Sequence, residues 1–97
     1  MDLKDRFLKY VSFDTQSDES SEKFPSTDKQ LALLKHLVEE MKGLGMTEVS
    51  IDKYGYAMGT IPATPGYENV PVIGFIAHVD TAPDMSGANV KPQIIEK

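Results

Sequence analysis

The stretch from Val70 to Val79 constrains the fold of this chain more than any other. It reads VPVIGFIAHV, is the most hydrophobic segment of the 97 residues and is rich in Val and Ile. Such a run is too short for a typical helix and fits a strand that is buried on both faces, with Pro71 tolerated only at its beginning. A strand of this kind needs neighbouring strands and covering helices. We therefore expect an α/β fold.

The rest of the chain supplies part of such a fold. Apolar residues at helical spacing predict helices, and alternating apolar and polar residues predict half-buried strands. The polar stretch between the helices is long for a loop, so it is either a solvated excursion or the border of a binding cleft or subunit contact. In chain order we expect a helix over 2–12 and the polar loop over 14–26. A second helix is expected to begin at a Thr27–Gln30 capping box and to end at the glycines of Gly43–Gly45. Strands over 49–52 and 56–61 and a further extended segment over 90–95 should follow.

This set of elements is too small to cover a doubly buried strand. Two short strands and one long helix leave faces of the expected sheet open, and a chain of this size buries only somewhat more than about 60% of its unfolded surface. The last residues, Ile94 to Lys97, add no further helix. Either self-association completes the core or the chain opens a longer protein, and we expect the second.

Composition excludes several classes of partner. Ten basic residues are scattered among fifteen acidic ones, for a net charge of −5. Nucleic acids and anionic membranes are therefore not expected as partners, because both require clustered Lys and Arg. The chain has no cysteine, so a metal ion would have to be held by His, Asp or Glu. Without a signal-like N-terminus or an apolar run of membrane-spanning length, we expect a cytoplasmic protein.

His78 and Asp80 form the pattern that carries chemistry. Side chains two apart on a strand share a face, so the imidazole and the carboxylate are expected within hydrogen-bonding reach. A metal-binding histidine uses one ring nitrogen on the cation and the other on such a carboxylate. The same spacing also occurs at ordinary strand ends. His36 and the adjacent Glu39–Glu40 are interpreted instead as the solvated face of the long helix.

The run HVDTAP, from His78 to Pro83, resembles the first metal motif, His-x-Asp-Thr-x-Pro, of the di-zinc aminopeptidase and deacylase family. Three longer stretches narrow the resemblance to the tripeptide-cleaving aminopeptidases of that family. They read RFLKYVSFDTQSDES from Arg6, PSTDKQLALLKHLVEEMKGLG from Pro25 and HVDTAPDMSGANVKPQIIE from His78. The resemblance spans essentially the whole chain.

The resemblance implies a zinc-exopeptidase-like catalytic domain with a mixed sheet flanked by helices, of which residues 1–97 would be the N-terminal segment. It implies two zinc ions per active site, with His78 as a ligand of one ion and Asp80 as the catalytic-site carboxylate that orients His78. Thr81 and Pro83 would shape the turn that holds both residues. The bridging Asp, the general-base Glu and the remaining ligands would lie beyond Lys97.

The implied activity is zinc-dependent release of the N-terminal residue of tripeptides, by attack of metal-activated water on the peptide bond. A small peptide substrate and a homodimer of the complete protein are implied as partners. The alternative within enzymes is a deacylase or dipeptidase on the same scaffold, and outside enzymes it is an interaction module using the 14–26 loop or the long helix. Because the chain offers one residue that would bind zinc directly and a catalytic zinc takes three from protein, we expect residues 1–97 alone to be inactive.

Overall fold

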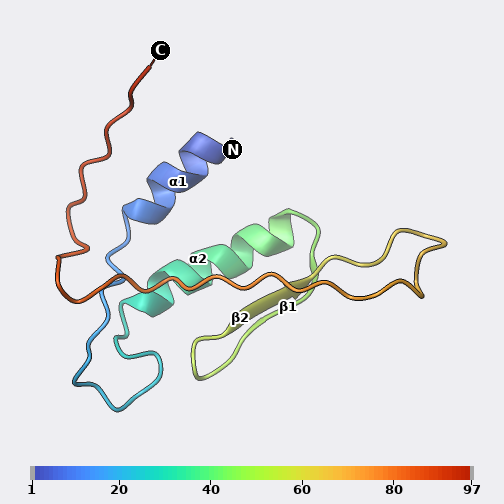
Figure 1. The fold of residues 1–97 in the computed structure, drawn as a ribbon, viewed down its shortest axis with the longest axis horizontal. Helices are drawn as coiled ribbons and strands as arrows, with labels where there is room; N and C mark the ends of the chain where they lie inside the picture. The colour runs from blue at the N-terminus through green and yellow to red at the C-terminus, as the bar shows by residue number, and fades with distance from the viewer. Residues whose placement is uncertain (1, 97) are drawn as a thin grey trace.

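The computed structural model describes residues 2–96 and contains two helices and one hairpin (Figure 1). The elements are α1 (Leu3–Val11), α2 (Gln30–Gly43), β1 (Thr47–Ile51) and β2 (Ala57–Thr60). The two strands pair antiparallel, and α2 packs against both of them. The expected α/β composition is therefore confirmed at this level. The expected mixed sheet is not seen, because the sheet within the described residues has only these two antiparallel strands.

Helix α1 agrees with its sequence prediction. The Asp2 carboxylate accepts a hydrogen bond of 2.8 Å from the backbone N–H of Asp5, which satisfies one of the free donors at the start of the helix. Asp5 lies in the first turn and Lys9 in the last turn, where their charges suit the helix dipole. The helix ends at Val11, one residue before the predicted boundary.

Helix α2 carries the buried core but begins later than predicted. The expected capping box is wrong, since the helix starts at Gln30 and its N-cap residue, Lys29, makes no side-chain capping bond. The Thr27 hydroxyl instead accepts from the side-chain amide of Gln30, at 3.0 Å. Helix α2 packs onto the hairpin and supplies the buried apolar residues of the described chain, Leu33, Leu34 and Val38.

The strands of the hairpin begin and end within one or two residues of their predicted boundaries. Its connecting turn is closed by the Asp52 carboxylate, which accepts from the backbone N–H groups of Tyr54 and Tyr56 at 2.9 and 3.0 Å. Gly55 takes a left-handed φ of +84° in this turn. An irregularity in β1 coincides with a positive φ at Glu48. The paired strands β1 and β2 both contact α2.

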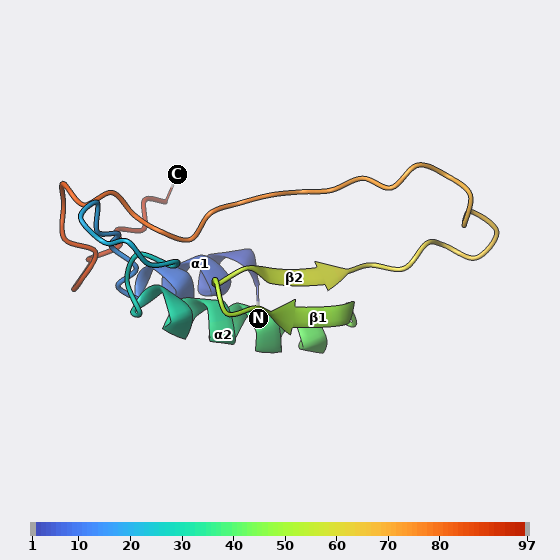
Figure 2. The same cartoon turned by 90° about the horizontal axis from the view of Figure 1, so that it is seen from below.

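The prediction of a buried strand over Val70–Val79 is wrong for this chain. The segment runs as an extended chain on the far side of β2 from β1, without joining the hairpin (Figure 2). Its side chains are open to solvent, with Val72 98%, Phe75 96% and Ile76 100% exposed. A strand is defined by ladder bonds to a neighbour, and no segment of residues 2–96 supplies them here. Residues 90–96 likewise form no helix or strand.

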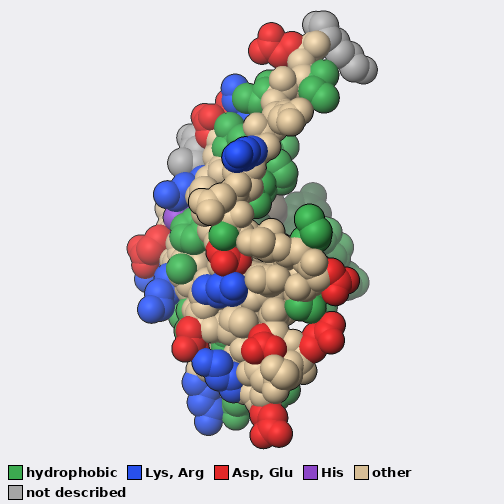
Figure 3. All heavy atoms as spheres, turned by 90° about the vertical axis from the view of Figure 1, so that its left-hand side faces the viewer, with side chains coloured by type: hydrophobic (Ala, Val, Ile, Leu, Met, Phe, Trp, Pro, Cys, Tyr) green, Lys and Arg blue, Asp and Glu red, His purple; other side chains and the backbone are tan. Residues whose placement is uncertain are grey.

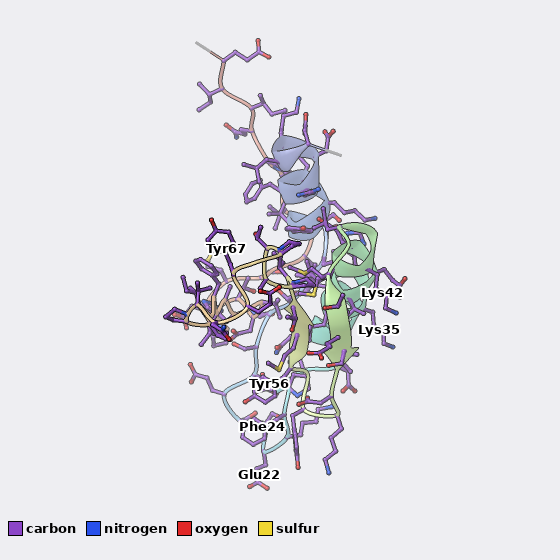
Figure 4. The ribbon with its side chains drawn as sticks, turned by 90° about the vertical axis from the view of Figure 1, so that its right-hand side faces the viewer. Glu22, Phe24, Lys35, Lys42, Tyr56 and Tyr67 are labelled. Carbon is purple, nitrogen blue, oxygen red and sulfur yellow. The ribbon has the colours of Figure 1, made fainter. Side chains whose placement is uncertain are left out.

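Charged side chains are distributed over the surface without a single-sign patch on the face that Figure 3 shows, where Lys, Arg, Asp and Glu alternate. On α2, Lys35 and Lys42 project from the side opposite to the loop that carries Tyr67 (Figure 4). Within the part of the chain that the structure covers, the helices are too short and too polar to cross a membrane.

Candidate functional site

The structure brings His78 and Asp80 together. The His78 Nδ1 atom lies 2.8 Å from Asp80 Oδ1 and 2.9 Å from the Asp80 carbonyl oxygen. With a proton on Nδ1, the ring donates to both oxygens, and its other nitrogen, Nε2, keeps a free lone pair. The His78 side chain is 84% exposed, so this lone pair is accessible. The pair therefore has the arrangement that a metal-binding histidine and its supporting carboxylate require.

The 14–26 loop holds the turn that follows the pair. Gln16 forms an isolated parallel bridge with Thr81, so the loop lies against the end of the extended segment. The N–H of Thr81 donates to Thr15 O at 3.1 Å, and the N–H of Ser17 donates to Thr81 O at 2.9 Å. Sequence reasoning did not single out Thr15, Gln16 or Ser17. The unusual length of their polar loop was the only signal, and the loop does border the candidate site.

A groove of about 670 Å³ opens between the extended segment and the α2–hairpin unit. His78 and Asp80 line it together with mostly apolar neighbours, among them Phe24, Tyr56 and Phe75. Figure 4 shows Phe24 and Tyr56 near the turn end of the hairpin. A mostly apolar groove with a few convergent polar groups has the character of a small-molecule site.

The residues present fit part of a metal site. The chemistry of His78, with one ring nitrogen on a carboxylate and the other accessible, suits a zinc ligand. A catalytic zinc takes three protein ligands, whereas no three His, Asp or Glu side chains of residues 2–96 converge in this way. Residues 2–96 therefore supply one ligand and its orienting carboxylate.

His36 does not lie on a solvated face, contrary to the prediction. Its ring is 6.0 Å from the ring of Tyr10 and 5.6 Å from that of Phe13, between the two helices. Its Nε2 lies 3.3 Å from Glu40 Oε2, one helical turn away. The helical pattern of α2 could not reveal this contact, because the covering side chains come from α1 and the residues after it.

The paired acids Glu39 and Glu40 also differ from each other. The Glu39 side chain is 75% exposed, as predicted, but the Glu40 side chain is only 17% exposed. Glu40 Oε1 accepts from the hydroxyl of Tyr10 at 2.6 Å and lies 3.1 Å from Arg6 Nε. Burial, and then the hydrogen bond to Glu40, raises the pKa of Tyr10 to about 12. This cluster joins the helices and lies apart from the His78–Asp80 groove.

Comparison with curated proteins finds relatives that are peptidases by name. Each is called peptidase T. The chain is 61% identical over 92 residues to the protein of Clostridium acetobutylicum, 58% over 94 residues to that of Aliivibrio fischeri, and 57% over 95 residues to that of a Geobacillus species. These matches cover 95 to 98% of the chain. The resemblance to peptidase T is therefore confirmed along nearly the whole chain.

The matched part is a minor share of those relatives. The chain spans 22 to 23% of the length of the same three proteins. A scan against protein-family models gave no match.

Proposed function

We propose that this chain is the N-terminal segment of a zinc-dependent aminopeptidase that releases the N-terminal residue of tripeptides. The observation that carries the proposal is the His78 Nδ1–Asp80 Oδ1 contact of 2.8 Å, which leaves Nε2 accessible in a chain similar to peptidase T. The sequence HVDTAP around the pair is the motif on which the family resemblance depends.

The residues of this chain would prepare one side of the site. Asp80 holds the proton on Nδ1 of His78, which fixes the tautomer, orients the ring and raises the basicity of Nε2. When bound, a zinc ion polarises the substrate carbonyl and lowers the pKa of a water molecule, so that hydroxide is available near neutral pH. The apolar wall of the groove offers contact area for a small peptide. The other ligands, the second metal ion and the general base come from outside these residues.

The test removes the proposed ligand from the full-length protein. His78→Ala is expected to reduce the zinc content from two ions per subunit to about one and to abolish tripeptide cleavage. Asp80→Asn retains the ligand but changes its orienting partner, so zinc affinity or activity should fall by about 10- to 100-fold. Zinc is measured by atomic emission after dialysis, and cleavage by release of the free amino acid.

The chain provides a matched control in its second histidine. His36→Ala removes an imidazole that contacts Tyr10 and Glu40 and does not line the groove, so it should leave the zinc content unchanged. An enzyme that keeps both zinc ions and full activity after His78→Ala would contradict the proposal. Loss in both histidine variants would indicate damage to folding, which the Asp80→Asn variant then separates from damage to the site.

A substrate series separates the proposed aminopeptidase from a deacylase or dipeptidase. The same histidine and carboxylate would activate water toward any amide, so the pair does not choose among these reactions. We expect the full-length protein to cleave a tripeptide but neither its N-acetylated form nor a dipeptide. Cleavage of the acetylated form would favour the deacylase, and preference for the dipeptide would favour the dipeptidase.

A further inference from the structure

The backbone between His78 and Asp80 is held by a buried threonine. The Thr15 hydroxyl donates a hydrogen bond of 2.7 Å to the carbonyl oxygen of Val79, the residue between the two members of the pair. Thr15 is only 3% exposed, so this hydroxyl has little access to water. A buried hydroxyl with a short, specific bond to the backbone is well placed to define where that backbone lies.

The same loop also holds both backbone groups of Thr81. The N–H of Thr81 donates to Thr15 O, and its carbonyl accepts from both the N–H and the hydroxyl of Ser17, at 2.9 and 2.8 Å. Together with the bond to Val79, these contacts hold the chain on either side of Asp80. The position of the Asp80 carboxylate therefore depends on residues more than sixty positions earlier in the sequence.

Gln16 extends this contact along the turn and anchors it to α2. Its side-chain amide donates to the carbonyl oxygens of Pro83 and Met85, at 2.9 and 3.0 Å. The backbone carbonyl oxygen of Gln16 accepts a hydrogen bond of 2.8 Å from the Thr27 hydroxyl. That hydroxyl accepts in turn from the side-chain amide of Gln30, a residue that is 6% exposed at the start of α2. A continuous hydrogen-bonded path thus runs from α2 to the turn after the His78–Asp80 pair.

No competing anchor is seen along the extended segment. In the described part of the chain, no backbone hydrogen bond joins residues 71–78 to another segment. The Thr15–Ser17 contacts are therefore what fixes the pair relative to α2 here.

We propose that Thr15 and Gln16 are positioning residues for the His78–Asp80 pair, and that Thr15 in particular sets the geometry in which His78 receives a metal ion. The inference rests on the proposed function, because it assumes that the pair binds zinc. Neither residue touches the metal ion in this proposal. Each acts through the backbone of the turn, in the way that partners beyond the ligands commonly tune metal affinity.

The test compares two substitutions of Thr15 in the full-length protein. Thr15→Val keeps the shape but removes the hydroxyl, whereas Thr15→Ser keeps the hydroxyl. Zinc dissociation constants are measured on the metal-free protein by competition with a chromogenic chelator, so the readout does not depend on catalysis. We expect Thr15→Val to weaken zinc binding by about tenfold. Thr15→Ser should retain a zinc affinity close to that of the unsubstituted protein, because it keeps the hydroxyl.

Gln16→Glu is a second variant, which still tests the inference if Thr15→Val does not fold. It conserves size but removes both N–H donors, and Gln16 is only half-buried, so folding should survive. It should also weaken zinc binding by about tenfold. Asp18→Ala, in the same loop, alters a side chain whose hydrogen bonds go to Ser20, and it should leave the affinity unchanged.

Zinc affinity that is unchanged in both Thr15→Val and Gln16→Glu would overturn the inference, as would equal losses in Thr15→Val and Thr15→Ser. His78→Ala, measured in parallel, separates this failure from a failure of the proposed function. If His78→Ala loses zinc and the loop variants do not, only the positioning role is wrong. If His78→Ala keeps both ions, the proposed function itself is wrong and the positioning role falls with it.

Discussion

Glu40 carries the polar contacts between the two helices. Its carboxylate lies against the Tyr10 hydroxyl, the Arg6 guanidinium and the His36 ring, and its side chain is 17% exposed. A largely buried carboxylate is costly unless it is paired. The Tyr10 hydroxyl donates a hydrogen bond to Glu40 Oε1, whereas Arg6 Nε and His36 Nε2 lie within ion-pair distance without forming a hydrogen bond. We therefore interpret the cluster as a structural contact that sets how α1 lies on α2.

The Tyr10 hydroxyl makes this contact sensitive to alkaline pH. Its pKa is raised from 10.0 to about 12, so the folded state holds the proton more tightly than the unfolded state does. The stabilisation is fully present below about pH 10 and is lost as the pH rises through about 12. Tyr10→Phe should remove this dependence. The check is ultraviolet absorbance of tyrosinate, in which the difference between the two proteins should show a group titrating near pH 12.

The single residues of the candidate site differ in how far sequence could identify them. His78 and Asp80 are two positions apart, and the period of an extended chain places them together without any tertiary information. Thr15 reaches Val79 across 64 residues, and Gln16 reaches Met85 across 69. Nothing in the local sequence of a polar loop specifies such distant partners, so only the folded chain could assign these contacts.

At the scale of elements, the turn between β1 and β2 depends on a glycine. Gly55 has φ +84°, and a Cβ placed there would lie 3.1 Å from Pro25 Cδ and 3.4 Å from Leu34 Cδ1. The left-handed backbone makes any side chain at this position strained, and an added Cβ would press on the loop and on α2. The hairpin thus packs on α2 through a position that favours glycine.

Gly55→Ala should destabilise the protein by more than the backbone term alone, which is about 1–2 kcal/mol for a left-handed residue. Gly66→Ala is the matched control, because Gly66 has φ +92° but no atom within 4 Å of its added Cβ. Urea unfolding measures both. Equal losses in the two variants would show that the contact with Pro25 and Leu34 adds nothing.

The elements also show where local pattern is sufficient. The two helices and the hairpin were predicted with boundary shifts of one to three residues, because amphipathic periodicity and turn chemistry act within a few positions. The Val70–Val79 strand was not formed, since pairing depends on a neighbour and not on its own residues. The hydrophobic pattern correctly identified an extended segment but said nothing about which segment would cover it.

At the scale of the whole molecule, apolar surface is left open along one edge. Val72, Phe75 and Ile76 are almost fully exposed on a segment with unpaired backbone groups. An extended segment with unpaired backbone groups and apolar side chains can pair with the edge of another chain. The described residues thus hold far more hydrophobic surface than their small core of Leu33, Leu34 and Val38 can bury.

The 97-residue chain on its own is therefore expected to self-associate through this segment. Ile76→Lys places a charge on the fully exposed position and should shift the chain toward monomer. Leu3→Lys is the control, because Leu3 is 81% exposed on α1, where no backbone edge is open. Sedimentation velocity over a concentration series measures both. A wild-type chain that stays monomeric, or equal effects of the two substitutions, would contradict this expectation.

Local sequence is sufficient to specify the helices, the hairpin, the extended course of residues 70–79 and the pairing of His78 with Asp80. Each of these follows from periodicity, turn chemistry or a spacing of a few residues, which act locally. Long-range folding is needed to explain why Thr15 and Gln16 hydrogen-bond to the backbone at and after the pair, why the Glu40 side chain contacts α1, and why the apolar segment is unpaired. Those outcomes depend on which distant groups meet, and contacts across tens of residues are set by the packing of the chain as a whole.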